Sequence, residues 1–186
     1  MSGKMTAIDE RVQRTRTNIA RAVIRIGQER GVDDLTVGEL AREAGISRST
    51  FYAHFGSLEH YLSQSFANMV EGMAAHAAHE AGPNDSRLLH VRRILDHVAE
   101  AGRYADEISQ SRYRPRMLAA GEERLRRHVD SRLTRLRPQL SEGERAALAR
   151  FVAAGFIAIL RSWMERGRKQ PPEAVQKQFE AIIERL

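Results

Sequence analysis

Residues 35–61, LTVGELAREAGISRSTFYAHFGSLEHY, decide the fold of this chain. Thr36 is followed three residues later by Glu39, which is the spacing of a capping box at a helix start. Gly45 then interrupts the helical pattern before a second short helix begins near Ser47. The stretch therefore predicts two short helices joined by a tight turn, which form either a helix-turn-helix or a plain αα-hairpin.

The second of these helices has two different faces. Phe51 and Phe55 lie four residues apart, so both side chains are expected to point into one small core. The opposite face then carries Arg48, Ser49, Tyr52 and Ala53. A short exposed helix of this composition suits insertion into the major groove of DNA.

These residues resemble the tetracycline-repressor (TetR) family of bacterial transcription regulators. The resemblance rests on the LTV entry at residues 35–37, the LA and AGIS of residues 40–47, and TFYAHF at residues 50–55. It covers about residues 13–73, and the remainder of the chain matches only in length and helical character.

The resemblance implies an all-α protein of about nine helices. We expect a three-helix DNA-binding head in residues 1–56, with the helix-turn-helix at about 36–55. Residues 57–186 would then form a helical body that binds a small effector and dimerises. The function implied is that of a homodimeric, ligand-responsive regulator, expected to be a repressor that its effector releases from operator DNA.

Candidate DNA contacts follow from the exposed face and from the resemblance. Arg48 is the strongest candidate for reading a base, because one guanidinium can bond both O6 and N7 of guanine. Ser49 and Ala53 suit small-residue or thymine-methyl contacts. Phosphate contacts, which the resemblance also implies, are expected from Thr36, Thr50, Tyr52 and His54.

Two positions depart from the family pattern. Leu58 stands where members commonly carry a lysine that contacts a phosphate, and Gly38 where they often carry a longer side chain that reaches DNA. These departures leave a second hypothesis open: a helical interaction protein of the same fold, without regulated DNA binding, that acts through an arginine-rich body. Strongly salt-dependent and sequence-selective DNA binding is expected only under the first hypothesis.

The net charge of +6 lies mostly outside the predicted head. Residues 1–60 hold nine Lys/Arg and eight Asp/Glu, whereas residues 61–186 hold 21 and 16. In the head, positive charge gathers on a polar N-terminal arm and a first helix at about 12–30, where it can neutralise phosphates or simply face solvent. The residues concerned are Lys4, Arg11, Arg14, Arg16, Arg21 and Arg25, opposed by Asp9 and Glu10. The arginine-rich segment at about 116–136 is either a solvated face with i,i+4 ion pairs or a contact for an acidic ligand, DNA or protein.

The resemblance also implies an apolar cavity in the body, beneath a helix expected from about residue 57 to 80. Large or polar-tipped side chains in the body can either wall this cavity or fill the core. They are Met69, Met73, His97, Tyr104, Tyr113, Met117, Phe156 and Trp163. We expect an effector that is apolar or amphipathic, and its identity is unknown.

The last two helices are predicted to form an association surface. Ser141 and Glu144 form a second capping box, and the helix that follows is rich in alanine and glycine, which allow another helix to approach closely. The final helix, after Pro171 and Pro172, carries an apolar stripe. Two such helices from each chain make a four-helix interface, unless they only complete the core of one chain. The expected interface residues are Val152, Gly155, Phe156, Ile159, Trp163, Val175, Phe179, Ile182 and Ile183.

Composition and motifs argue against other classes of protein. The chain has no cysteine, which excludes disulfides and thiolate metal sites. It has no glycine-rich phosphate loop, nucleophile elbow or HExxH motif, so we expect neither an enzyme nor a cofactor. Histidines near residues 76–80 and 90–97 are better explained as isolated side chains than as a metal site. The polar first twenty residues and the short apolar run at 151–160 predict a cytoplasmic protein without a membrane contact.

Overall fold

The computed structural model describes the backbone of residues 2–185 and the side chains of residues 13–185. Within this range the chain forms nine α-helices and no strand, so the all-α prediction is confirmed. The helices are α1 (Ser2–Arg30), α2 (Val37–Glu43), α3 (Arg48–Phe55), α4 (Leu58–Ala81), α5 (Arg92–Glu100), α6 (Arg103–Gln110), α7 (Arg114–Leu136), α8 (Glu142–Glu165) and α9 (Pro172–Ile183).

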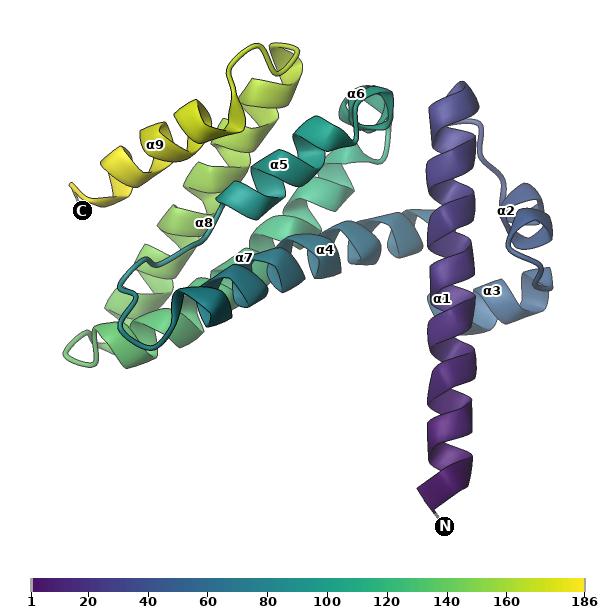
Figure 1. The fold of residues 1–186 in the computed structure, drawn as a ribbon, viewed down its shortest axis with the longest axis horizontal. Coiled ribbons are helices and arrows are strands. Elements are labelled where there is room, and N and C mark those ends of the chain that lie inside the picture. Colours follow the sequence, from purple (N-terminus) through teal and green to yellow (C-terminus); the bar gives the residue numbers. More distant parts are fainter. Residues whose placement is uncertain (1, 186) are drawn as a thin grey trace.

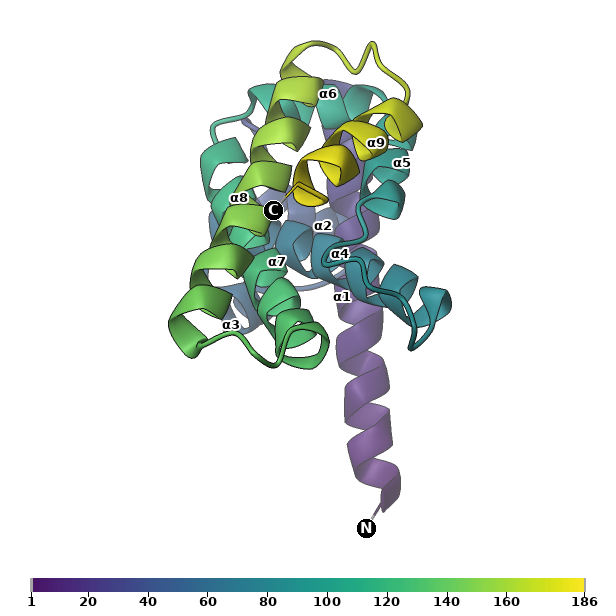
Figure 2. The same cartoon turned by 90° about the vertical axis from the view of Figure 1, so that its left-hand side faces the viewer.

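The helices are arranged as a head and a body that α4 connects (Figure 1). The head, α1 to α3, stands at one end of the molecule, and α8 and α9 lie at the other end. A quarter turn brings α8 and α9 in front of the remaining helices (Figure 2). The arm that we expected before the first helix is part of α1. The side chains of Lys4, Asp9, Glu10 and Arg11 lie outside the described residues.

Local capping starts the helices where the sequence predicts. The Glu39 amide donates to Oγ1 of Thr36 over 3.3 Å, and the Thr36 amide donates to Oε2 of Glu39 over 3.1 Å, which confirms the capping box. Hydrogen bonds from Arg30 and from Thr36 lower the pKa of Glu39 to about 2. The same reciprocal pair of bonds joins Ser141 and Glu144 at the start of α8.

Two apolar clusters hold the molecule together. The head cluster contains the fully buried Ile19, Leu40 and Phe51, and also Met117 of α7. The body cluster gathers the inward faces of α4, α5, α7, α8 and α9. Because α4 supplies residues to both clusters, the predicted domain boundary at residues 56–57 stays a prediction.

Helices α4 and α7 pack closely in the body because α7 carries a glycine at their contact. A Cβ added at Gly121 would come within 2.6 Å of Cε1 of Phe66. That separation is far inside van der Waals contact, so an alanine would force the Phe66 ring to shift. The Phe66 ring of α4 can therefore occupy its position only because residue 121 has no side chain.

Among the described residues, α8 alone is long and apolar enough, by length and composition, to cross a membrane. The uninterrupted apolar run at 151–160 is shorter than this helix. The inward side chains of α8 include Val152, Phe156 and Trp163, all of which are buried in the body cluster. Packing within the protein therefore accounts for part of its apolar character.

A buried group of ionisable side chains joins the α4–α5 loop to α7. Nη2 of Arg132 donates to Oδ2 of Asp85 over 2.8 Å, and Nε of Arg132 donates to the Arg87 carbonyl over 2.7 Å. Nε2 of His90 lies 2.8 Å from the same Asp85 oxygen. Nε2 of His128 is buried without a hydrogen-bond partner in the structure. Burial lowers the pKa of His90, although Asp85 acts in the opposite direction. Burial also lowers the pKa of His128, and the nearby charge of Arg132 lowers it further.

These two histidines should make stability depend on pH near neutrality. Because their folded-state pKa values lie below the ordinary value, the unfolded chain takes up protons first as the pH falls below about 6.5. We expect the free energy of unfolding to decrease between pH 7.5 and 5.5, by at most roughly 1.4 kcal/mol per pH unit for each histidine. Urea titrations at the two pH values measure this change. His128→Leu should flatten the dependence. A slope equal to that of the wild type would contradict the assignment.

Candidate DNA-binding surface and ligand cavity

The outward face of α3 is exposed as the sequence predicts. Ser47 caps the helix, with its Oγ accepting from the Thr50 amide over 3.0 Å. Phe51 is fully buried beneath the helix, while 52% of Tyr52 is exposed. Thr50 is half-buried, and the remaining predicted contacts of the head are exposed: Thr36, Arg48, Ser49, Ala53 and His54. These side chains are therefore gathered around one short, accessible helix.

Ser47 is a residue of this surface that the sequence analysis treated only as a helix start. Its hydroxyl lies 2.8 Å from Oγ of Ser49 and 2.8 Å from Oγ1 of Thr50. Two of the predicted contacts are thus tied to the cap of the helix that carries them. The Ser-Arg-Ser-Thr order after a glycine was the available signal, because serine is a preferred N-cap.

Arg48 lies across α2 at Gly38. A Cβ added at Gly38 would come within 2.8 Å of both Nε and Cζ of Arg48, and closer still to Nη2. The guanidinium therefore rests directly on the glycine. In the part of the chain whose side chains are described, no carboxylate oxygen lies within 4.0 Å of this guanidinium. Its donors remain available to a ligand outside the chain.

Some of the basic residues of the head already have acidic partners. Arg25 pairs with Glu29 at 2.9 Å and with Glu43, and Arg30 pairs with Glu39 at 2.7 Å. Arg14, Arg16 and Arg21 are exposed on α1. Leu58, at the position of the family lysine, is buried in the head cluster as the first residue of α4. It therefore acts as a core side chain and leaves that phosphate contact without a donor.

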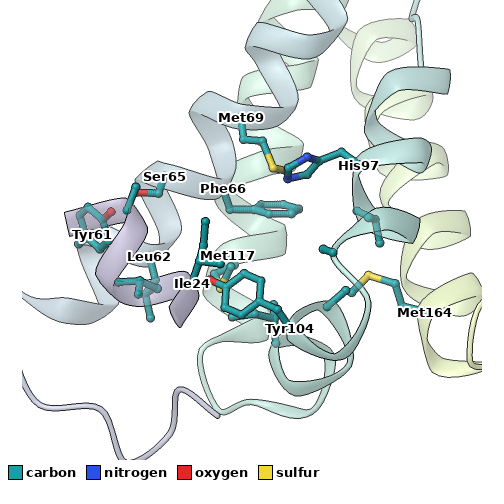
Figure 3. Close-up of a pocket in the computed structure, with 16 residues that line it drawn as sticks. Ile24, Tyr61, Leu62, Ser65, Phe66, Met69, His97, Tyr104, Met117 and Met164 are labelled. Atoms are coloured by element: carbon teal, nitrogen blue, oxygen red, sulfur yellow. The ribbon is translucent and has the colours of Figure 1, made fainter. Parts of the chain in front are cut away.

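A cavity of about 280 Å³ lies between the head and the body. Its walls come from α4, α5, α6, α7 and α8, and also from Ala20, Val23 and Ile24 of α1. Figure 3 shows Phe66 and Met69 of α4, His97 of α5, Tyr104 of α6 and Met164 of α8 around this space. None of the sixteen lining residues is Asp, Glu, Lys or Arg, so the cavity suits an uncharged, mainly apolar group.

Four of the eight predicted pocket residues line this cavity: Met69, His97, Tyr104 and Met117. Met73, Tyr113, Phe156 and Trp163 do not, because Phe156 and Trp163 are buried in the body cluster, Tyr113 in the head cluster, and Met73 packs against the body core. The sequence analysis missed Tyr61, Ser65 and Phe66, which lie on the face of α4 that also carries Met69. It also missed the contribution of α1 and of Met164.

Tyr104 connects the cavity to the head. A Cβ added at Gly27 of α1 would come within 2.7 Å of Cδ2 of Tyr104 and closer to Cε2, so the ring lies against the backbone of α1. Burial raises the pKa of Tyr104, and also that of Tyr61, above the ordinary tyrosine value. Both hydroxyls therefore stay protonated at neutral pH and can donate a hydrogen bond to an occupant of the cavity.

The arginine-rich helix α7 is largely occupied by ion pairs within the chain. Arg124 pairs with Glu71 at 2.8 Å, Arg126 with Glu123 at 2.8 Å and Arg132 with Asp85 at 2.8 Å. Arg114, Arg116 and Arg127 also lie within 4.0 Å of a glutamate. This pairing supports the interpretation of the segment as an ion-paired face.

The predicted association residues divide between the inside and the outside of the chain. Val152, Phe156, Trp163, Val175 and Phe179 are buried within one protomer, so the prediction that they form an outer surface is wrong. Gly155, Ile159 and Ile183 are half-buried, and 41% of Ile182 is exposed. Phe151, which the sequence analysis missed, is 53% exposed on α8. Ala147 and Ala158, also exposed, flank it along that helix.

Metal ligands are not grouped in the described side chains. No set of three or more His, Cys, Asp or Glu residues there has the arrangement of a metal site. His90 lies against Asp85, and His76 lies 3.4 Å from Glu80, its neighbour one turn along α4. The exposed surface of α3 and the apolar cavity are the candidate functional sites of this structure.

Comparison with known proteins agrees with this architecture. Residues 19–60 match the model of bacterial regulatory proteins of the tetR family. Residues 88–185 match a model described as a transcriptional regulator C-terminal region. A curated relative, the uncharacterised HTH-type transcriptional regulator YxbF of Bacillus subtilis (strain 168), is 23% identical over 95% of this chain and 46% of its own length. The chain thus spans about half the length of that relative.

Solved structures of low sequence identity share the fold. The TetR-family transcriptional repressor FadR of Thermus thermophilus, in complex with lauroyl-CoA, superposes with a TM-score of 0.66 at 18% identity over 90% of this chain and 92% of its own. A TetR transcriptional regulator of Streptococcus agalactiae 2603V superposes with a TM-score of 0.60 at 22% identity, over 96% of this chain and 98% of its own. Together with the two family models, which match both the head and most of the body, the comparisons show that this chain belongs to the TetR family of bacterial transcriptional regulators.

Proposed function

We propose that this protein is a homodimeric repressor that binds a two-fold-symmetric operator and leaves it when an apolar or amphipathic effector enters the cavity. The observation that carries the proposal is the cavity itself, since its walls include both the body and α1 of the head. An occupant can favour one position of the head over another only if it contacts the two parts differently. A cavity between them provides such contacts.

The chemistry of the cavity indicates the class of effector. Its lining is almost entirely apolar, with His97, Ser65 and two tyrosines as the polar groups. The part of the effector that is buried is therefore uncharged and bears one or two hydrogen-bonding atoms. The structural relative from Thermus thermophilus was solved with lauroyl-CoA, a molecule with a long apolar chain. Acyl-chain compounds are accordingly the first effectors to test.

Dimerisation is proposed through the outer faces of α8 and α9. Phe151 and Ile182 are large apolar side chains that remain substantially exposed in the single chain. A Cβ added at Gly155 would meet no atom within 4 Å, so the surface beside Phe151 is open to another helix. Pairing two copies there would bring two heads to one DNA duplex, as a palindromic operator requires.

The first test is selection of bound duplexes from a random DNA pool by the purified protein at two salt concentrations. Recovery of a two-fold-symmetric site, bound by two copies of the chain, supports the proposal and supplies an operator. Acyl compounds can then be titrated against the protein–operator complex, and the loss of repression can be followed with a reporter gene. Recovery without sequence preference would refute the proposal and favour the alternative of an interaction protein that acts through its arginine-rich body.

Arg48 is expected to supply sequence preference at one base pair of each half-site. Arg48→Ala should weaken binding of the selected operator by about 1–3 kcal/mol and relax the preference at that base pair. Exchange of Arg14, which is exposed on α1, for alanine is the control. If Arg14 contacts a phosphate, its loss weakens binding to all sequences alike. A selection profile for Arg48→Ala identical to that of the wild type would contradict the assignment of Arg48 as a base-reading residue.

A further inference from the structure

The helix-turn-helix contains an unusual placement of charge. Arg48 is the first residue of α3, and its guanidinium lies on Gly38, the second residue of α2. The guanidinium therefore lies at the amino-terminal turn of α2, and the residue that carries it begins α3. Helix amino termini carry a partial positive charge and favour anions, so this arrangement is locally unfavourable.

No described side chain neutralises this charge. Glu39, the nearest acidic residue in the sequence of α2, accepts from Arg30 at 2.7 Å and from the amide and hydroxyl of Thr36. Within the described part of the chain, Arg48 takes part in no ion pair. A cation that is exposed, has no ion-pair partner among the described side chains and lies at a helix amino terminus is the kind of local conflict found at binding sites.

The glycine makes this placement possible. A Cβ at Gly38 would lie 2.8 Å from Cζ and Nε of Arg48, well below the 3.4 Å at which ordinary contact begins. Any side chain at position 38 would therefore displace the guanidinium from this position. Glycine also weakens a helix, since it loses more conformational entropy on folding than alanine does. Its presence at this point of α2 is thus not explained by helix stability.

We propose that Gly38 is a specificity-determining positioning residue, whose missing side chain forms the seat that fixes Arg48 for reading one base pair. In this arrangement α2 contributes to base recognition by leaving room for the Arg48 guanidinium, without a contact from a side chain of its own. The seat restricts the rotamers of Arg48 before DNA arrives, so less conformational entropy is lost when its donors bind a base. This inference rests on the proposed operator binding.

The test is a double-mutant cycle on the selected operator, with Gly38→Ala, Arg48→Ala and the double variant. Gly38→Ala should weaken operator binding by about 5- to 30-fold, a large part of the effect of losing one base-reading arginine. It should also relax the preference at the same base pair that Arg48→Ala relaxes. In the Arg48→Ala background, Gly38→Ala should change affinity by less than about twofold, because its target is already absent.

Gly143→Ala is the matched control. Gly143 is also the second residue of a helix that starts with a capping box, and a Cβ there would meet no atom within 4 Å. Both alanine variants should melt at or above the wild-type temperature, since alanine favours the helix more than glycine does. Loss of binding by Gly38→Ala therefore cannot be ascribed to unfolding.

The outcomes separate the inference from the function on which it rests. If the wild type binds no operator selectively, the proposed function fails and the seat has no role. If the wild type binds but Gly38→Ala binds like Gly143→Ala, the function stands and the seat is refuted. Equal losses from Gly38→Ala with and without Arg48 would also refute it, because the effect would then not pass through the arginine.

Discussion

Replacement of Asp85 by alanine should lower the free energy of unfolding by about 3–5 kcal/mol. The side chains of Asp85 and Arg132 are only 8% and 7% exposed, and Oδ2 of Asp85 accepts from Arg132 over 2.8 Å. Without the carboxylate, the guanidinium would remain buried with no counter-charge. Burial alone would raise the pKa of Asp85, but hydrogen bonds from Arg87 and His90 keep it below its ordinary value, so the carboxylate is charged at neutral pH.

Urea denaturation at pH 7 and a fixed protein concentration measures this loss. Asp96→Ala is the control, because Asp96 pairs with Arg92 one turn earlier on the exposed side of α5. That pair should contribute only about 0.3–0.5 kcal/mol. A cost below about 1 kcal/mol for Asp85→Ala would mean that Arg132 escapes to solvent, and would contradict its role as a buried link between α7 and the α4–α5 loop.

Trp163→Ala should cost a similar amount, about 3–5 kcal/mol. Trp163 is 2% exposed within the body cluster, and its Nε1 donates to the Gln170 carbonyl over 2.9 Å. The substitution leaves a cavity and removes the donor that holds the loop before α9. Since these contacts lie within one chain, the loss should persist at protein concentrations low enough to separate the subunits of the proposed dimer.

The concentration series is what makes this prediction decisive. Were Trp163 an interface residue, as its apolar spacing first suggested, the effect of the variant would vanish once the dimer had dissociated. Tyr52→Ala is a matched truncation of an aromatic side chain that is 52% exposed. It should cost less than about 1.5 kcal/mol, at most the value of its edge contact with Phe51.

Elements with local signals could be predicted from the sequence. The two capping boxes, at Thr36 and at Ser141, each depend on residues within one helical turn, and the structure contains both. The exposed face of α3 follows from the spacing of Phe51 and Phe55 for the same reason. Short-range spacing fixes these features before any tertiary contact forms.

Features that depend on the packing of distant helices could not be predicted. Helix α8 carries one apolar stripe with Val152 and Phe156 and another with Ala147, Phe151 and Ala158. Periodicity reveals both stripes but not which of them the neighbouring helices cover. The prediction chose the larger side chains for the outer surface, whereas α7 and α9 bury them.

The contribution of α1 to the cavity was not predicted, for a related reason. This wall exists because α6 packs against α1, with Tyr104 against Gly27. The two residues are separated by more than seventy positions, and a glycine gives no hydrophobic signal. The arginines of α7 show the reverse case, since their pairing with Glu71, Glu59 and Asp85 is invisible from the composition of the helix alone.

The position of Tyr104, between the cavity and the backbone of α1, has a thermodynamic consequence. If an effector displaces this ring, α1 must also adjust, so the position of the head and the occupancy of the cavity share one coupling free energy. This linkage is reciprocal. If the effector lowers the affinity of the protein for the operator by some factor, the operator lowers the affinity of the protein for the effector by the same factor. A promoter-bound dimer would respond only at higher effector concentrations than the free protein, and the number of operators in the cell would shift the threshold of the response.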